Sequence, residues 1–419
     1  MSSAPGTASR HPLLPLADPR TIRARCAAIL RAVDANVSGH FTVDRRALPA
    51  LAERVAELTR RRFPDGRIPL HSRWRHFEAG GIDRKPVLDE RLDSASAADA
   101  ARARFDLAVV SVLLDAGAGP DWHYQEGELR LSRSEGLAVA SWHAFLAGSF
   151  SATPGEPLRT DAAALARIDA AALRRVFQAE GGNALPGLEG RAGLLARLGA
   201  ALGAEAVRSE LPARPALLYD LLTEGGRRTE VGADEILGQV LRVLGPIWTS
   251  GSRVQGLLAG DVWPHLWAGD AAGEGGRDPT TGGWVPLHKL SQWLAYSLVE
   301  PLQWAGVAVT GLEQLTGLAE YRNGGLLIDG GLIVPRNPAS LARRWKPQDD
   351  FIVEWRALTV ALLDELAVAV RGRLGRTAAE LPLAALLEGG TWAAGRAIAL
   401  ERREGGAPPL HIDSDGTLF

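Results

Sequence analysis

Residues 284–331 read WVPLHKLSQWLAYSLVEPLQWAGVAVTGLEQLTGLAEYRNGGLLIDGG and contain the pattern on which the rest of the chain depends. Five leucines recur there at helical spacing and predict a helix with one apolar stripe: Leu287, Leu290, Leu294, Leu298 and Leu302. Pro286 suits the first helical turn, where a missing N–H costs nothing. Pro301 is expected to kink or end the helix near its last turn.

The opposite face of this helix predicts a polar pocket. It carries Lys289, Gln292, Trp293 and Tyr296, with His288 just before them, where a plain solvent face would carry Glu, Lys and Arg. The chain has 47 Lys and Arg residues, and only three are lysines, so 44 are arginines. A lysine retained in so arginine-rich a chain indicates a site, because the two cations differ in shape and hydration. The alternative is a surface lysine that pairs with an acid.

A second set of polar residues follows the helix. Glu320, Tyr321 and Arg322 stand side by side before a pair of glycines, which we interpret as a turn. Residues 326–329 are then expected to form a short buried strand ending in Asp329. We predict that Glu320 and Lys289 are catalytic and that Asp329 offers a second carboxylate, with Tyr321, Arg322, Gln292, His288 and Trp293 binding the substrate. The alternative is a surface turn with an Arg–Glu pair.

Length and composition limit the class of protein. The chain has 419 residues, a net charge of −2 and one cysteine, Cys26. The charge argues against nucleic acid or acidic membranes as partners. The single cysteine excludes a disulfide framework and a cysteine metal site. The first 20 residues contain no apolar run long enough for a signal peptide, and no 18-residue apolar run occurs elsewhere, so we expect neither a signal peptide nor a transmembrane helix. We therefore expect a cytoplasmic protein whose oligomeric state the sequence does not give.

Helical periodicity dominates the rest of the chain and predicts a mainly α, multi-helical globular fold with a few short strands around one central pocket. We expect residues 1–20 to form a flexible tail, residues 21–150 an N-terminal helical lobe and residues 151–419 a C-terminal helical lobe that carries the main site motifs. The two lobes could form one domain. The clearest predicted helices span residues 21–33, 44–63, 96–114, 233–244 and 351–374.

Several polar residues outside the central stretch are further candidates for substrate binding. Arg73 lies in a stretch, residues 70–81, that is dense in Arg, His and aromatic side chains and ends at two glycines. Six of the twelve tryptophans lie between Trp248 and Trp304, which favours an aromatic-lined pocket. The candidates from these regions are Arg73, Asp115, Trp122, Asp261 and Trp263. For the stretch around Arg73, a helix end whose polar groups pair with one another is an equally good interpretation.

Residues 115–119 read DAGAG, a pattern that also occurs in nucleotide loops of methyltransferases and Rossmann domains. The signal is weak because Pro120-Asp121-Trp122 follows, with no glycine opening a helix. HExxH, Walker, G-x-S-x-G and CxxC motifs are all absent from the sequence. No cofactor or metal is expected. The chemistry left is that of carboxylates, Lys, Arg and aromatic groups, which suits cleavage through an oxocarbenium-like transition state.

The motifs together resemble those of the uracil catabolism protein four family, over most of the chain. They are SRWRHFEAGGIDR (residues 72–84), LLDAGAGPDWHY (113–124), SEGLAVAS (134–141), GDVWPH (260–265), VPLHKLSQWLAYSLVEPL (285–302) and LTGLAEYRNGGLLID (315–329). The resemblance implies a role in the pathway that opens the pyrimidine ring of a uracil nucleotide and releases urea.

A second, shorter likeness concerns mechanism. Lys289-x-x-Gln292 followed by Leu315-Thr316-x-x-Ala319-Glu320-Tyr321-Arg322 looks like the queuosine salvage glycosylases. Those mainly α-helical enzymes hydrolyse the N-glycosidic bond of a modified nucleoside 5′-monophosphate. Their acid is Asp where this chain has Glu320, and their Val-Pro-Gln is replaced by Asn323-Gly324-Gly325. These departures concern the substrate base more than the reaction type.

The sequence thus favours an N-ribosyl hydrolase that splits a ribosylurea 5′-phosphate, a small phosphorylated ribosyl substrate, into urea and ribose 5-phosphate. Arg322 and Arg73 would hold the phosphate, and Trp122, Trp263 and Trp293 would form the walls. Three alternatives stay open: another hydrolase or amidase step of pyrimidine degradation, a methyltransferase-like enzyme, and a non-catalytic partner of other pathway enzymes.

Overall fold

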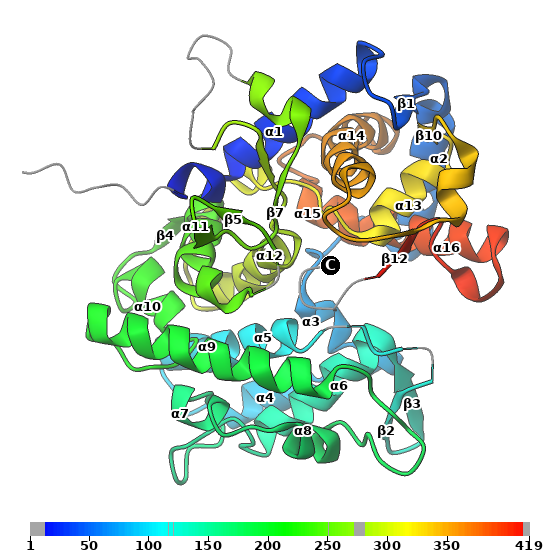
Figure 1. Cartoon of the computed structure of the whole chain (residues 1–419). Helices are drawn as coiled ribbons and strands as arrows, with labels where there is room; N and C mark the ends of the chain where they lie inside the picture. Colours follow the sequence, from blue (N-terminus) through cyan, green and yellow to red (C-terminus); the bar gives the residue numbers. More distant parts are fainter. Residues whose placement is uncertain (1–12, 116, 120, 250, 272–280, 414–419) are drawn as a thin grey trace, which may run out of the picture.

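The computed structural model describes residues 13–115, 117–119, 121–249, 251–271 and 281–413, and it is mainly α-helical, as the sequence predicts (Figure 1). The α-helices are α1 (Pro19–Asp34), α2 (Leu48–Arg62), α3 (Arg73–His76), α4 (Lys85–Arg91), α5 (Ala97–Leu113), α6 (Arg133–Leu146), α7 (Ala162–Leu165), α8 (Ala170–Val176), α9 (Leu188–Ser209), α10 (Leu217–Thr223), α11 (Ala233–Leu244), α12 (Lys289–Trp304), α13 (Tyr321–Asp329), α14 (Asp350–Leu374), α15 (Leu383–Leu386) and α16 (Trp392–Arg402).

The strands are short, and in the described ranges they form six separate two-stranded sheets. The antiparallel pairs are β1 (Phe41–Val43) with β10 (Ile333–Pro335), β2 (His123–Glu126) with β3 (Leu129–Ser132), β5 (Arg253–Val254) with β6 (Leu257–Leu258), and β7 (Val262–Pro264) with β8 (Trp284–Pro286). The parallel pairs are β4 (Glu230–Gly232) with β9 (Ala308–Thr310) and β11 (Arg344–Trp345) with β12 (His411–Ile412).

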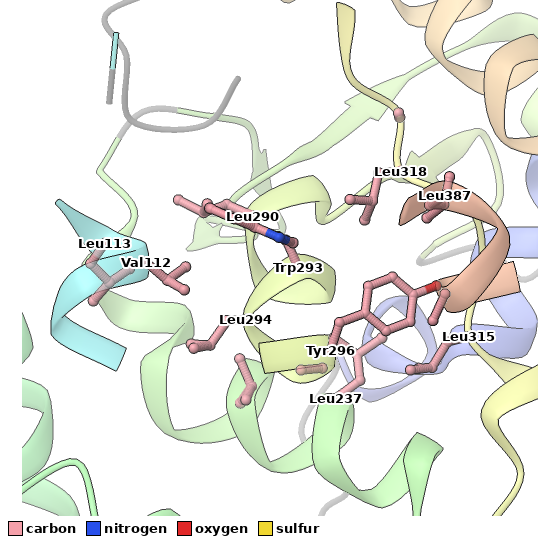
Figure 2. Packing of buried hydrophobic residues seen from close by; sticks show 14 of the residues in the cluster. Val112, Leu113, Leu237, Leu290, Trp293, Leu294, Tyr296, Leu315, Leu318 and Leu387 are labelled. Carbon is pink, nitrogen blue, oxygen red and sulfur yellow. The ribbon is translucent and has the colours of Figure 1, made fainter. Parts of the chain in front are cut away.

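Helix α12 packs against α5 and α11, and all five leucines of the predicted stripe are buried, although Leu287 precedes the helix. Figure 2 shows the apolar side chains of α12, α5 and α11 meeting around it. The helix begins at Lys289, so the placement of Pro286 in its first turn was wrong: Pro286 ends β8. The left-handed backbone of His288 (φ 44°) separates the strand from the helix. Pro301 lies inside the last turn, and the helix ends at Trp304.

Helix α13 corrects a second expectation. Residues 326–329 were predicted to form a strand after a glycine turn, but Gly324 and Gly325 lie inside the helix. The reason is close packing: a Cβ on Gly324 would lie 2.4 Å from Cζ2 of Trp355 in α14, and one on Gly325 would lie 3.1 Å from Cδ of Pro409. Both glycines therefore allow neighbouring segments to pack closely against α13. In sequences, paired glycines more often indicate a turn.

The other clear helix predictions are confirmed as α1, α2, α5, α11 and α14 to within a few residues, although α1 already begins at Pro19. Helix α14 contacts α1, α2 and α13, and one continuous cluster of buried apolar side chains extends from Ile22 to Leu410. The proposed division near residue 150 stays a prediction. Residues 1–12 of the expected tail lie outside the described part of the chain.

A Rossmann arrangement is not found among the described residues, because every sheet has two strands. Asp115 follows the end of the buried helix α5, where a nucleotide loop would follow a strand. The loop therefore gives no structural support to a methyltransferase. Among the helices described, every one is too short or too polar to pass through a bilayer.

Candidate functional site

Glu320 caps the N-terminus of α13 and is buried. Its two carboxylate oxygens accept hydrogen bonds from the backbone N–H groups of Arg322 (2.8 Å) and Asn323 (2.5 Å). Ser, Thr, Asp and Asn are the usual capping residues, so a longer glutamate here is unusual. Burial raises the pKa of the Glu320 carboxyl, against the opposing effects of these N–H groups and of the nearby Lys289 ammonium.

Lys289 stands at the first position of α12 and is partly exposed. Its ammonium lies 5.8 Å from the centre of the Trp293 ring. Its positive charge acts on the carboxyls of both Glu320 and Asp115 and favours their ionised forms. It is joined to neither by a direct ion pair in the described residues. The ammonium is thus close enough to act electrostatically on both carboxyls, and a shared catalytic role for Lys289 and Glu320 stays a prediction.

Arg73 and Asp115 form the second charged pair of this cluster. Arg73 is fully buried; its Nε donates to Oγ of Ser111 (2.7 Å), and its Nη1 lies 3.2 Å from Oδ1 of Asp115. Burial lowers the pKa of the Arg73 guanidinium. Burial also opposes ionisation of Asp115, but the neighbouring positive charges, that of Arg73 foremost, together hold the pKa of its carboxyl below the usual range. Asp115 is therefore an anion beside the buried Arg73, with a side chain that is 9% exposed.

Trp293 lies beside Lys289, Arg73 and His76. Its ring is 5.6 Å from the Arg73 guanidinium and 5.6 Å, edge to face, from the ring of His76. Figure 2 shows Trp293 projecting from α12 at the end of the helix nearest Leu318. Burial, followed by the charge of Arg73, lowers the pKa of His76 to about 4. A neutral imidazole and an indole thus face the charged pair.

Several of the residues just described carry buried polar atoms without a hydrogen bond. In the described residues they include Nη2 of Arg73, Nδ1 of His76, Nε1 of Trp293, Nε of Arg322 and Oδ1 of Asn323. Most buried polar groups in native proteins are hydrogen-bonded, so such a concentration marks a place where a polar ligand would be bound.

A cavity of about 690 Å³ opens beside the cluster. His71, His76 and Arg322 line it and connect it to the buried charges, because His71 also acts electrostatically on Glu320. The arginines lining it are Arg62, Arg75, Arg130, Arg133, Arg322 and Arg396, and the acids are Glu135 and Glu388. Its volume suits a small phosphorylated molecule, and its excess of arginine suits an anion.

Asp261 and Trp263 belong to a saturated network away from the unpaired atoms. Both oxygens of Asp261 bond Arg356 of α14 at 2.7 Å, and they also accept from Nε1 of Trp263 (2.7 Å) and the backbone N of Lys289 (3.0 Å). This network fixes the start of α12. It therefore positions Lys289, and it leaves these two residues little capacity to contact a substrate.

Gln292 is buried and joins α12 to the residues on either side of it through hydrogen bonds. Its Oε1 accepts from Oγ1 of Thr316 (2.7 Å), and its Nε2 donates to the Leu287 carbonyl (2.8 Å). His288 is likewise bonded, through Nε2, to the Leu16 carbonyl (2.9 Å). His288 lines a different cavity of about 950 Å³ between α11 and the β5–β6 hairpin.

Trp122 and Asp329 bond other parts of the fold, whereas Tyr321 lies beside Arg322, whose Nε is one of the unpaired atoms. Trp122 packs on Phe177 and donates to its carbonyl (3.0 Å). Asp329 ends α13, opposite the Glu320 end, and forms a two-point ion pair with Arg403. Tyr321 is 39% exposed and stacks on Arg322. The substrate-binding and catalytic roles given to all these residues stay predictions.

The residues that sequence reasoning passed over are His71, Glu388 and Arg133. Nδ1 of His71 lies 2.9 Å from Oε2 of Glu388, which stands in a π-helical turn, Leu387–Thr391. Such turns occur often at functional sites, but no periodic pattern in the sequence predicts one. Arg133 has a left-handed backbone (φ 55°), which is uncommon for a side chain of this size. In the described ranges, three or more His, Cys, Asp or Glu side chains are nowhere grouped to hold a metal ion.

A mainly α-helical fold with a buried charged cluster beside an arginine-lined cavity can now be compared with known proteins. Residues 15–419 match the family described as "Protein of unknown function (DUF1688)". The chain is 37% identical to "Protein urg3" of Schizosaccharomyces pombe over 406 residues, which cover 95% of this chain and 96% of that protein. It is 35% identical to "Uracil catabolism protein 4" of Lachancea kluyveri over 380 residues, 84% and 85% of the two chains. The protein belongs to this family, as the sequence motifs predicted.

Proposed function

We propose that the protein is an enzyme of uracil catabolism that hydrolyses the N-glycosidic bond of a ribosylurea 5′-phosphate, releasing urea and ribose 5-phosphate. The pathway is supported by the printed name of one relative, "Uracil catabolism protein 4". The reaction is supported chiefly by one observation: in the described part of the chain, residues in contact with Lys289, Glu320 and Asp115 carry buried polar atoms without a hydrogen bond, and one of these residues, Arg322, also lines the cationic cavity.

The carboxylates supply the chemistry of glycosidic cleavage. Positive charge develops at C1′ as the C–N bond breaks, and a buried anion stabilises it strongly where water is scarce. Glu320 is the group we assign to this role and to orienting the attacking water. In this proposal Lys289, whose charge acts on both acids, opposes the effect of burial on the Glu320 carboxyl and contacts the ribose hydroxyls.

The arginines of the cavity bind the phosphate in this proposal. Arg322 keeps its Nε free of protein hydrogen bonds, in the described part of the chain, while its Nη1 is fixed on the Gly406 carbonyl (2.9 Å). Arg73 is bound to Ser111 and Asp115 and lies deeper, so we assign it to the ribose end of the substrate. An arginine fork suits a phosphate monoester because it donates two parallel hydrogen bonds.

The test is turnover of purified ribosylurea 5′-phosphate by Glu320→Gln and by the unchanged protein. We expect urea and free ribose 5-phosphate from the unchanged protein, and a loss of about 10²-fold or more in kcat for the variant, as for removal of one electrostatic stabiliser. Circular dichroism and the melting temperature serve as the folding control, because Gln keeps one capping oxygen. Ammonia and carbon dioxide as products would assign the protein to an amidase step instead. Unchanged turnover would remove Glu320 from the mechanism.

A further inference from the structure

The cavity holds an imidazole whose position matches that of a proton-transferring group. His71 is buried, lines the cavity, and stands directly before α3 with its backbone N–H bonded to the Ala384 carbonyl (2.9 Å). The rings of Trp293 and Trp392 lie 6.4 Å from it, one from α12 and one from α16. The backbone bond therefore fixes the chain at His71, and two indoles lie near the ring.

Glu388 fixes the tautomer of this ring. Its Oε2 lies 2.9 Å from Nδ1 of His71, and its Oε1 forms an ion pair with Arg62 (2.9 Å). Burial opposes ionisation, but the bond from His71 and the charges of His71 and Arg62 hold the pKa of the Glu388 carboxyl at about 2. An ionised carboxylate only accepts hydrogen bonds, so Nδ1 must carry the hydrogen.

The other nitrogen of His71 is the reactive one. In the neutral ring Nε2 is then an acceptor, and in the charged ring it is a donor. Among the described residues no protein group bonds Nε2, whereas Nδ1 is engaged by Glu388. A carboxylate behind an imidazole, with the far nitrogen open to a cavity, is the arrangement by which hydrolases stabilise an imidazolium.

We propose that His71 is the general acid of the reaction, with Glu388 as its positioning residue. This inference rests on the proposed function. The C1′–N bond breaks and its electron pair leaves with the urea nitrogen, which takes the proton from Nε2 of His71. The oxygen of water bonds to C1′ and its proton goes to Glu320. Exchange with solvent then returns a proton to His71 and removes one from Glu320.

Protonation of the leaving group is needed because a urea anion is a poor leaving group, and general acids contribute about 10²–10⁴-fold to such steps. The charged and titratable groups that face His71 are Glu388 from the π-helical turn, Arg62 from α2, His76 from α3 and Glu320 from α13. Glu78 and Glu300 act on Glu388 from a greater distance. Glu388 is the one of these that bonds the ring.

The test compares two leaving groups in the full-length protein. His71→Asn keeps an N–H donor for Glu388 but has no proton to give to a leaving group. We expect kcat/KM for ribosylurea 5′-phosphate to fall about 10²–10⁴-fold, while 4-nitrophenyl ribofuranoside 5-phosphate, whose phenolate leaves unprotonated, is cleaved within about tenfold of the normal rate. His411→Asn, on an exposed histidine, is the control and should change neither rate.

Glu388→Gln provides an independent measurement through the pH profile. It keeps an acceptor for Nδ1 but removes the negative charge that stabilises the imidazolium, so the alkaline limb of kcat/KM should move to lower pH. Equal losses on both substrates, no loss on either, or an unmoved limb would overturn the assignment of His71 while leaving the proposed function intact. Absence of urea release from the unchanged protein would overturn both.

Discussion

Oγ1 of Thr316 donates to Oε1 of Gln292 at 2.7 Å, and this buried bond connects α12 to the segment that ends in Glu320. Oε1 of Gln292 also accepts from the Thr316 backbone N–H (3.4 Å), and the Thr316 carbonyl accepts from the hydroxyl of Tyr296 (2.5 Å). The side chains of Gln292 and Tyr296, both on α12, therefore fix the position of Thr316. The separation of Lys289 and Glu320 depends on this connection.

Gln292→Leu should destabilise the fold by about 1–3 kcal/mol, because it leaves buried partners on Thr316 and Leu287 without hydrogen bonds. Chemical denaturation measures the change. Gln303→Leu on the same helix is the matched control, since Gln303 is exposed, and it should stay within about 0.5 kcal/mol. Equal changes in the free energy of unfolding for the two substitutions would show that the bond to Thr316 does not stabilise the fold.

Gly324→Ala tests the close contact between α13 and α14. The added Cβ would lie 2.4 Å from Cζ2 of Trp355, and such overpacking costs about 1–3 kcal/mol or more. Gly372→Ala in α14 is the control, because nothing lies within 4 Å of its Cβ and alanine favours a helix by about 1 kcal/mol. Opposite shifts in melting temperature are expected, and a stabilised Gly324→Ala protein would contradict the helix packing.

This contact also explains where sequence reasoning failed. Paired glycines before Leu326 resemble a turn, and only the position of Trp355, far along the chain, shows why a helix needs them. Local apolar periodicity was sufficient to predict α11 and α14. Lys289 and Glu320 lie on two clear motifs, so the sequence could nominate both residues, and their joint role stays a prediction. The partnership of His71 with Glu388 could not, because it joins residues 317 positions apart through a π-helical turn.

Asp261 illustrates the converse. An acid beside tryptophan in a loop indicates a site, yet its oxygens are fully used by Arg356, Trp263 and the backbone of Lys289. Whether a polar residue has spare hydrogen-bonding capacity is a property of its neighbours in space. Residue type alone therefore does not distinguish residues that would contact the substrate from residues that only position them.

The partly buried His76 should make stability depend on pH between about 4 and its ordinary pKa of 6.5. Its pKa is lower in the folded than in the unfolded protein, so the unfolded chain binds more protons in this window and stability falls as the pH falls. The loss approaches about 3 kcal/mol, at 1.4 kcal/mol per pKa unit. His76→Gln should lack this part of the loss when denaturation is followed from pH 6.5 to 4. His411→Gln, on an exposed ring, should follow the unchanged protein, and a His76→Gln curve of the same slope would contradict burial of a neutral ring.

Arg133 is the cavity arginine best suited to a test of phosphate binding. It is exposed, and it makes no hydrogen bond or ion pair to another described side chain, while its charge reaches the Tyr321 hydroxyl beside Arg322. Its left-handed backbone is a strained conformation of the kind often found at ligand sites. Removing it should therefore cost ligand affinity and little stability.

Arg133→Gln should weaken binding of ribose 5-phosphate about tenfold or more, because a charge-assisted hydrogen bond is worth about 1.5–3 kcal/mol. Binding of unphosphorylated ribose should not change. Isothermal titration calorimetry with the two sugars separates the phosphate contribution from that of the ribose. Arg61→Gln is the matched control, since Arg61 is equally exposed but lies outside the cavity. Equal weakening by the two substitutions would indicate a general effect of net charge, and unchanged affinity for ribose 5-phosphate in Arg133→Gln would place the phosphate elsewhere.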